Sequence, residues 1–178
     1  MEYIYHRVVD NMQGKILYPL NVLKDKYPDQ YAEHVKKYQG REQVLKIQIP
    51  ILNCLWNDVL HFTAVPPETL FANLKSTGFE VEKWLWKKWY KIPADLLESS
   101  NTIVCLYERD LRIVPDATDF YSYDPNKIEE YRKVPQVTLD YYKEKFDAGE
   151  RPLLFHHIPH ILYKGAIDVT GVEIIDLS

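Results

Sequence analysis

The alternation of hydrophobic and polar positions divides the chain into short strand-like and helical segments. Residues 2–9 (EYIYHRVV) are β-branched and aromatic, which favours a first strand. From residue 19 to residue 38 apolar side chains recur every three or four positions, which predicts a helical stretch ending at Gly40 and interrupted at Pro28. Residues 41–48 fit a helix and a strand equally well.

The central run of the chain, residues 51–63, is apolar on both of its faces and therefore predicts one buried central strand. A helix then starts at Pro66 or Pro67 and ends at Gly78. Hydrophobic and polar side chains alternate over residues 80–92, which again favours a strand. Together these three segments place a strand, a helix and a second strand in the middle of the sequence.

The second half of the chain is divided more finely. Residues 93–99 fit one helical turn, residues 102–107 a compact buried strand, and residues 116–125 a turn-rich loop over a site. Short helices are predicted at residues 126–133 and 136–148, and three short strands near the end are separated by Pro159, Gly165 and Gly171. This order of strands and helices along the chain predicts one α+β domain over residues 1–178, with a mostly antiparallel split sheet and peripheral short helices.

Composition narrows the range of partners. The net charge of −4 provides no general attraction to a polyanion, so nucleic-acid binding requires a local patch. The one candidate patch consists of Lys83, Trp84, Trp86, Lys87 and Lys91, where tryptophans would stack on bases and lysines would neutralise phosphates. The alternative is that these tryptophans belong to the core.

Other features point to a compartment. Cys54 and Cys105 lie in apolar runs without a spaced framework, which favours reduced core cysteines. Residues 1–20 lack the apolar segment of a signal peptide, and no run reaches the ~20 apolar residues of a membrane span. We therefore expect a soluble cytoplasmic protein with no membrane partner.

Polar groups within the apolar central run are the first chemical signal. Asn57, Asp58, His61 and Thr63 are costly to bury unless they are paired. A strand places Asn57, His61 and Thr63 on one face, either as a polar network or as a pocket wall. The group His156, His157 and His160 does not predict a metal site, because Pro159 prevents the helix that would align two of these ligands.

Several enzyme classes lack their motifs in this chain. No G-x-S-x-G nucleophile motif is present, and neither cysteine has an electropositive neighbour in the sequence. The six glycines form no Walker or dinucleotide-binding fingerprint.

The order of short motifs resembles that of bacterial ADP-ribosyltransferase-fold proteins, and of the DarT-like DNA ADP-ribosyltransferases among them. The motifs are an early Y-H-R, then Y-Q-G-R-E, then D-V-L-H-F-T running into V-P-P-E-T-L-F, and finally I-P-H-I-L-Y-K-G-A-I-D-V. The resemblance implies NAD as a substrate, and it implies an early histidine at the cofactor, an arginine after it, and a strand leading into a helix beneath the nicotinamide pocket.

Applied to this chain, the resemblance assigns His6 to the early histidine and Arg41 to the arginine, with Tyr3 or Tyr5 beside the cofactor. The strand at Asn57–Thr63 and the helix from Pro67 become the pocket wall. The candidate catalytic residues are His6, Arg41, His61 and His160, and the candidate cofactor-binding residues are Tyr5, Arg7, Asn57, Thr63 and Lys164.

A late catalytic glutamate is the part of the family pattern that this chain does not match. Glu150 and Glu173 are available, but neither stands in a matching context. Without such a glutamate, the chain either binds a nucleotide without transferring ADP-ribose or uses His156 or His160 instead.

Three functions follow from these observations. The first is an NAD-dependent ADP-ribosyltransferase-like enzyme that modifies a nucleic acid or a protein, in a toxin or phage-defence setting. The second is a non-enzymatic nucleotide- or protein-binding module that uses the aromatic residues Tyr121, Tyr123, Trp84 and Trp89. The third is a metal-independent ribonuclease that uses His61 with His156 or His160 as an acid/base pair.

Overall fold

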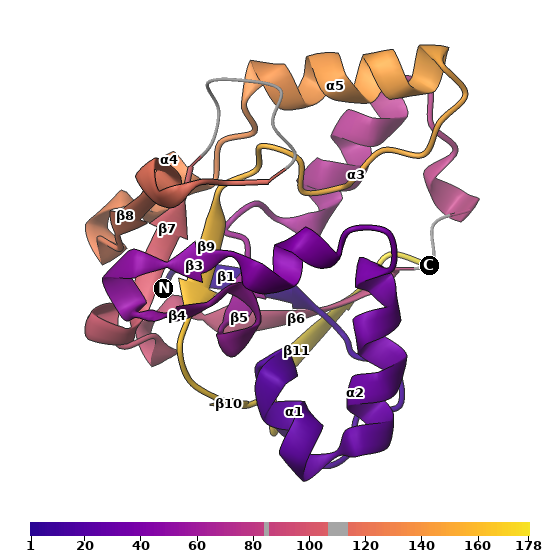
Figure 1. Ribbon diagram of the computed structural model, residues 1–178. Coiled ribbons are helices and arrows are strands. Elements are labelled where there is room, and N and C mark those ends of the chain that lie inside the picture. The colour runs from indigo at the N-terminus through magenta and orange to yellow at the C-terminus, as the bar shows by residue number, and fades with distance from the viewer. Residues whose placement is uncertain (84–85, 107–113) are drawn as a thin grey trace.

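The chain has an α+β fold in which helices surround small antiparallel sheets, as predicted (Figure 1). A computed structural model describes residues 1–83, 86–106 and 114–178. The pairings between the strands described are antiparallel. This arrangement confirms the expected fold class.

The first sheet has the order β1-β6-β11. It is formed by β1 (Tyr3–Arg7), β6 (Lys88–Pro93) and β11 (Glu173–Asp176). Strand β6 lies in the middle, and its Trp89 and Ile92 are almost completely buried. The sheet thus joins the two ends of the chain through a strand from its centre.

The second sheet has the order β5-β9-β7-β8. Its strands are β5 (Leu60–Phe62), β9 (His160–Tyr163), β7 (Thr102–Cys105) and β8 (Phe120–Ser122). All four residues of β7 are buried, as the compact apolar run predicted. Strand β8 falls within the segment expected to be a loop, because its turn residues form only the flanking 3-10 turns.

Within the described residues one isolated bridge joins the two sheets, where Tyr5 of β1 pairs with Thr63 just after β5. The Tyr5 amide donates to the Thr63 carbonyl at 2.7 Å, and the Thr63 amide donates back to the Tyr5 carbonyl at 3.1 Å. The result is the split sheet expected from the sequence. Two smaller ladders pair β2 (Ile16–Leu17) with β10 (Ile167–Asp168) and β3 (Gln48–Ile49) with β4 (Cys54–Leu55).

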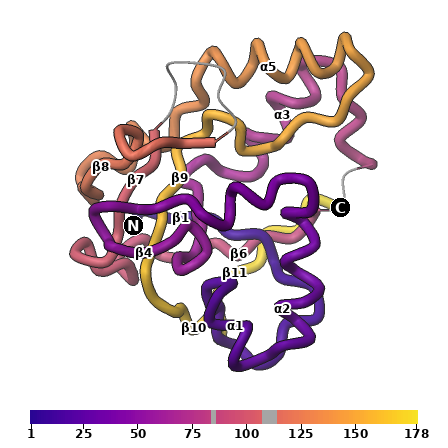
Figure 2. The backbone as a smooth tube through the Cα atoms, in the orientation of Figure 1, coloured from indigo at the N-terminus to yellow at the C-terminus, as the bar shows by residue number. Residues whose placement is uncertain are grey.

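The helices lie on either side of the sheets (Figure 2). Helices α1 (Leu20–Lys26) and α2 (Pro28–His34) form one arm, divided because Pro28 starts a new helix. Helix α3 (Pro67–Ser76) packs beside α5 (Gln136–Asp147) on the opposite side, and α4 (Ile128–Tyr131) is a single turn. The 3-10 turns lie at Val35–Tyr38, Glu42–Lys46, Pro50–Leu52, Trp56–Asp58, Val81–Lys83, Ala94–Leu96, Ser99–Asn101, Ala117–Asp119 and Pro125–Lys127.

The prediction of one continuous strand over residues 51–63 is wrong. Asn53 adopts a left-handed conformation with φ 45°, which ends the turn at Pro50–Leu52. The Asp58 carboxylate then accepts a hydrogen bond of 2.7 Å from the Leu55 amide and closes the turn at Trp56–Asp58. Local side-chain bonds of this kind compete with strand pairing, so only β4 and β5 remain extended.

The predicted strand at residues 80–92 is also shorter than expected. The sequence from Val81 to Lys83 forms a 3-10 turn, and strand β6 begins only at Lys88. Both cysteines are buried, as expected of core residues. Among the helices described, none has the length and apolar character needed to cross a membrane.

Candidate functional site

A cleft of about 570 Å³ lies where the two sheets meet. Its lining includes Tyr5 and Thr63, the two residues that join the sheets, together with side chains from α1, α2 and the segment before β9. This volume lies within the range of small-molecule and cofactor sites. The cleft is therefore the first candidate for a ligand site.

Three histidines from three strand regions line this cleft: His6, His61 and His160. A ring nitrogen of each lies within hydrogen-bonding distance of a backbone carbonyl. The partners are Arg7 O for His6 Nδ1 at 2.6 Å, Trp56 O for His61 Nε2 at 2.8 Å, and Ile158 O for His160 Nδ1 at 2.7 Å. Because a carbonyl only accepts, these contacts assign the N–H of each neutral ring to the backbone.

The protein environment keeps these imidazoles neutral. Burial lowers the pKa of His6 and of His160 to about 4, and it lowers the pKa of His61 well below its ordinary value. The neighbouring His160 and Lys37 lower the His61 pKa further. At neutral pH these three rings are therefore uncharged, and the second nitrogen of each is an acceptor.

His61 and His160 lie on the same face of the second sheet. His61 is paired with Leu162 across β5 and β9, and His160 stands two positions before Leu162, so the two rings are diagonal neighbours. The indole of Trp56 lies beside both rings, with centroid distances of 4.6 Å to His61 and 5.9 Å to His160. This packing fixes the orientation of both imidazoles.

Asn57 brings an unpartnered donor to the cleft. Its Oδ1 accepts a hydrogen bond of 2.9 Å from the Tyr38 hydroxyl, and its Nδ2 is buried without a partner in the part of the chain that the structure describes. The side chain is only 2% exposed. A buried amide donor is costly when unpaired, so this atom marks a position for an acceptor atom of a ligand.

Four cationic side chains line the cleft: Arg7, Lys37, Arg41 and Arg151. Among the described residues that line it, none is an aspartate or a glutamate. The Lys37 ammonium is desolvated although part of its side chain is exposed, and with the charges of Arg7 and Arg41 this lowers the Lys37 pKa to about 8. The lining is therefore a cluster of like charges in a protein whose net charge is −4.

Aromatic rings supply the apolar part of the lining. The guanidinium carbon of Arg7 lies 5.0 Å from the Trp86 ring centroid, and that of Arg151 lies 6.0 Å from it. Cations at this distance are attracted by the face of an indole. Three tyrosines from the helical arm and the residues next to it also line the cleft: Tyr18, Tyr27 and Tyr38.

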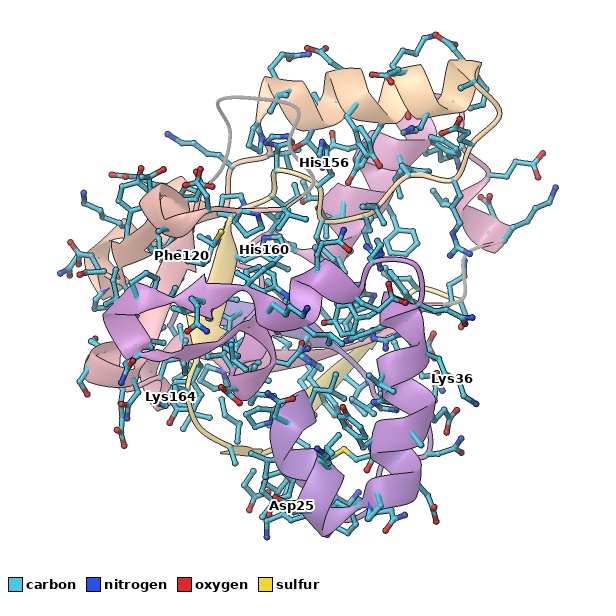
Figure 3. All side chains as sticks on the ribbon, viewed as in Figure 1. Asp25, Lys36, Phe120, His156, His160 and Lys164 are labelled. Atoms are coloured by element: carbon cyan, nitrogen blue, oxygen red, sulfur yellow. The ribbon has the colours of Figure 1, made fainter. Side chains whose placement is uncertain are left out.

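The cleft brings together most of the residues singled out from the sequence. The candidates that line it are His6, Arg41, His61, His160, Tyr5, Arg7, Asn57 and Thr63. Lys164 does not line the cleft (Figure 3). It follows the last residue of β9, whereas His160 is the first residue of that strand. Its ammonium donates to the Leu52 carbonyl at 2.9 Å instead.

The two glutamates considered for catalysis lie elsewhere. Glu150 forms an ion pair with Lys145, and Glu173 forms one with Lys91 on the first sheet. Neither lines the cleft. His156 does line it, and its ring is buried beside Tyr141 at 3.9 Å between centroids.

The sequence did not single out three residues of the cleft: Lys37, Tyr38 and Arg151. Lys37 and Tyr38 follow α2 in a 3-10 turn, where the periodicity marked only Tyr38 as apolar. Arg151 stands beside Pro152 in a segment without periodicity. The pattern contained no signal for Lys37 or Arg151 beyond their charge.

The residues proposed for nucleic-acid contact have separate partners. Lys83 pairs with Glu80, Lys91 pairs with Glu173, and the Lys87 ammonium donates to the Val81 carbonyl at 2.8 Å. Trp86 lines the cleft, whereas Trp84 lies outside the described residues. Within residues 1–83, 86–106 and 114–178, no cluster of three or more His, Cys, Asp or Glu side chains is suited to a metal ion.

Neither a protein-family model, nor a curated protein, nor a solved structure matches the chain. The chemistry of the cleft is therefore inferred from its own groups. Cations, aromatic faces, imidazole acceptors and a buried amide donor together suit a ligand that combines phosphates, hydroxyls and planar rings.

Proposed function

We propose that the protein binds NAD in this cleft and acts as an ADP-ribosyltransferase-like enzyme on a nucleic acid or a protein. The observation that carries the proposal is the composition of the lining, which joins four cations and several aromatic rings without a described carboxylate. NAD has the complementary groups, since it contains a pyrophosphate, two ribose rings and two planar heterocycles.

Each group of the cleft has a role in this proposal. Arg7, Lys37 and Arg41 bind the pyrophosphate through charge-assisted hydrogen bonds. The imidazoles of His6, His61 and His160 accept hydrogen bonds from ribose hydroxyls, since their N–H groups are already used by backbone carbonyls. The ligand acceptor that faces Asn57 Nδ2 satisfies the buried amide.

Holding the cofactor in this way favours loss of nicotinamide. Cleavage of the glycosidic bond gives an oxocarbenium-like centre on the ribose, and a fixed conformation of the ribose and pyrophosphate lowers the entropic part of the barrier. The phosphates of NAD, fixed by the cations, lie on the same molecule as the developing positive charge. The positions of His6 on β1 and of β5 before α3 also support the likeness to ADP-ribosyltransferase-fold proteins.

We further propose that the protein works in the cytoplasm. The burial of both cysteines in apolar parts of the core supports a reducing compartment. The acceptor is a nucleic acid in the first instance, reached through Trp86 and the cations at the cleft.

The test is release of nicotinamide from NAD by the purified protein, with and without DNA, RNA or lysate, followed by mass spectrometry of the acceptors. We expect ADP-ribose adducts from the wild-type protein and their loss in the double variant His6→Ala, Arg41→Ala. The control is Lys36→Ala, which removes an exposed charge at a residue outside the lining of the cleft (Figure 3). Unchanged turnover in a folded double variant would refute the site.

Nucleotide binding without transfer is the second candidate, and the lack of a described carboxylate in the lining favours it. In that case NAD stabilises the protein, by about 2.7 kcal/mol at a hundredfold its Kd, and no nicotinamide is released. The ribonuclease hypothesis requires one protonated imidazole as an acid, and the low pKa values of His61 and His160 argue against one at neutral pH.

A further inference from the structure

Three side chains at the wall of the cleft form a chain of hydrogen bonds: Trp56, Tyr38 and Asn57. The Tyr38 hydroxyl lies 2.9 Å from Oδ1 of Asn57. Burial raises the pKa of Tyr38 to about 12, against the opposing effects of the Arg41 charge and of a hydrogen bond with the Trp56 side chain. The hydroxyl therefore keeps its proton at neutral pH and contacts both neighbours.

The indole of Trp56 fixes the direction of this chain. Its Nε1–H is a donor without acceptor capacity, so Trp56 donates to the Tyr38 oxygen. The proton of the Tyr38 hydroxyl then goes to Oδ1 of Asn57, an amide oxygen that only accepts. A reversed Asn57 amide would turn Nδ2 toward the hydroxyl and remove the acceptor that this proton now has. The hydroxyl thus holds the amide in one orientation.

The amide nitrogen of Asn57 is the open end of the chain. Nδ2 is buried and has no partner within the residues that the structure describes, and the side chain is 2% exposed. A buried donor without a partner is costly. A ligand atom that accepts a hydrogen bond removes this cost. A ligand atom that donates adds to it, because two N–H groups would face each other.

Within NAD, the acceptor that suits Nδ2 is one that projects from a ring. Nδ2 is recessed in the wall, beside Trp56 and the uncharged ring of His61, whose centroids are 4.6 Å apart. The ring nitrogens of adenine are level with the edge of a flat ring. The oxygen of a ring carboxamide stands beyond the edge and reaches further into a wall. The carboxamide of nicotinamide contains the one carbonyl group of NAD.

We propose that Tyr38 is the specificity-determining residue of the cleft: by holding Oδ1 of Asn57 it presents Nδ2 to the ligand, so that the cleft selects a planar ring with a carbonyl substituent over one with an amino substituent. In NAD the selected group is the carboxamide of nicotinamide. The inference rests on the proposed function, in which the phosphates face the cations and the ribose hydroxyls face the imidazoles. Tyr38 acts through Asn57 and is a positioning residue.

The test compares the Kd values of three dinucleotides for the full chain by calorimetry. They are NAD, its 3-acetylpyridine analogue, which keeps the carbonyl, and its 3-aminopyridine analogue, which places a donor on the ring. We expect the acetylpyridine analogue to bind within about threefold of NAD and the aminopyridine analogue to bind about tenfold more weakly or worse. In Tyr38→Phe this ratio should fall below about threefold, because the amide is free to turn Oδ1 toward the amine.

The ratio of Kd values separates positioning from a general loss of structure. If Tyr38 only supported the fold, Tyr38→Phe would weaken all three ligands alike and leave the ratio unchanged, which would overturn the inference. Asn57→Leu keeps the branching of the side chain and removes both amide atoms, so it should bind NAD and the aminopyridine analogue equally. Tyr31→Phe removes a hydroxyl on α2 outside the lining and is the matched control, with the wild-type ratio expected.

Other outcomes with the wild-type protein distinguish this inference from the proposed function. Equal Kd values of NAD and the aminopyridine analogue would overturn the selection of a carbonyl, while binding of NAD stands. About tenfold tighter binding of an NAD analogue with hypoxanthine in place of adenine would place Asn57 at the other ring and overturn the carboxamide assignment. No binding of any dinucleotide would refute the proposed function and, with it, this ligand group.

Discussion

The Tyr38 hydroxyl donates a 2.9 Å hydrogen bond to Oδ1 of Asn57, and this bond turns the amide so that Nδ2 is left as a buried donor without a partner among the described residues. Tyr38 ends the 3-10 turn that follows α2, and Asn57 lies in the turn before β5. The hydrogen bond therefore connects the segment after the helical arm to the central part of the chain at the wall of the cleft.

Asn57→Ala tests whether this donor serves a ligand. We expect the Kd for NAD to rise about tenfold, equivalent to about 1.4 kcal/mol, because a hydrogen bond to the ligand is lost. Isothermal titration calorimetry measures the change, and Asn73→Ala on α3 outside the lining is the control. An unchanged Kd would show that Nδ2 contributes nothing to binding.

The affinity for NAD is expected to fall as the pH rises above 8. The Lys37 pKa lies near 8 in the folded protein and near 10.5 in the unfolded chain, so the ammonium loses its charge in the cleft first. Titrations between pH 7 and pH 9.5 measure this effect. Lys37→Arg remains charged and keeps its affinity over this range, and Lys37→Gln binds weakly at every pH.

The same shift has the opposite effect on the stability of the free protein. Because the folded pKa is lowered, the unfolded chain binds more protons between pH 8 and 10.5, and the Lys37 contribution to stability rises with pH in this range. A loss of affinity above pH 8 that Lys37→Arg shares would assign the titration to another group.

Acid is expected to destabilise the fold between pH 6.5 and pH 4. The pKa values of His6 and His160 fall from 6.5 to about 4 on folding, so the unfolded chain takes up protons first and stability decreases as the pH falls through this range. The loss is a few kcal/mol per histidine at most. Urea unfolding at pH 7 and pH 5 measures it. His160→Asn, which cannot titrate, should show a smaller difference between the two pH values than the wild type.

Asp58 is expected to position Asn57 without touching the ligand. Its carboxylate accepts hydrogen bonds of 2.7 Å from the Leu55 amide and from Asn21 Nδ2. Asp58→Ala should lower the free energy of unfolding by about 1–3 kcal/mol and weaken NAD binding, because the turn that carries Asn57 loses its cap. Thermal unfolding and calorimetry measure both effects. Asp25→Ala, at an exposed position on α1, is the control (Figure 3).

The sequence was most informative where one physical signal dominated. Pro28 divided the helical arm into α1 and α2, Pro67 and Gly78 bounded α3, and the apolar run predicted as a strand at residues 102–107 contains β7. It misled at residues 51–63, where the apolar pattern predicted one strand. There the hydrogen bond from the Leu55 amide to Asp58 and the left-handed conformation of Asn53 determined the backbone conformation. The alternation of apolar side chains along a strand contains no information about either.

The cleft was predictable only in part. The polar cluster from Asn57 to Thr63 stood out because buried polar groups need partners. Asn57 and Thr63 both line the cleft. The contribution of Lys37 and Arg151 depends on how distant segments approach each other, which the order of side chains does not specify. Lys164 was misplaced for the same reason, since β9 separates it from His160.

The junction between Tyr5 and Thr63 has a consequence for hydrogen exchange. Each sheet has its own ladder of hydrogen bonds, and among the described residues the reciprocal pair at 2.7 and 3.1 Å is the one backbone connection between the two ladders. Either half can then open without first breaking the ladder of the other. A ligand that contacts both His6 on the first sheet and His61 on the second would be released when either sheet opens. Its binding free energy is therefore added to the free energy of opening of each sheet. Occupancy of the cleft would therefore slow amide exchange in β6 and β9 together, strands that are not neighbours in either sheet.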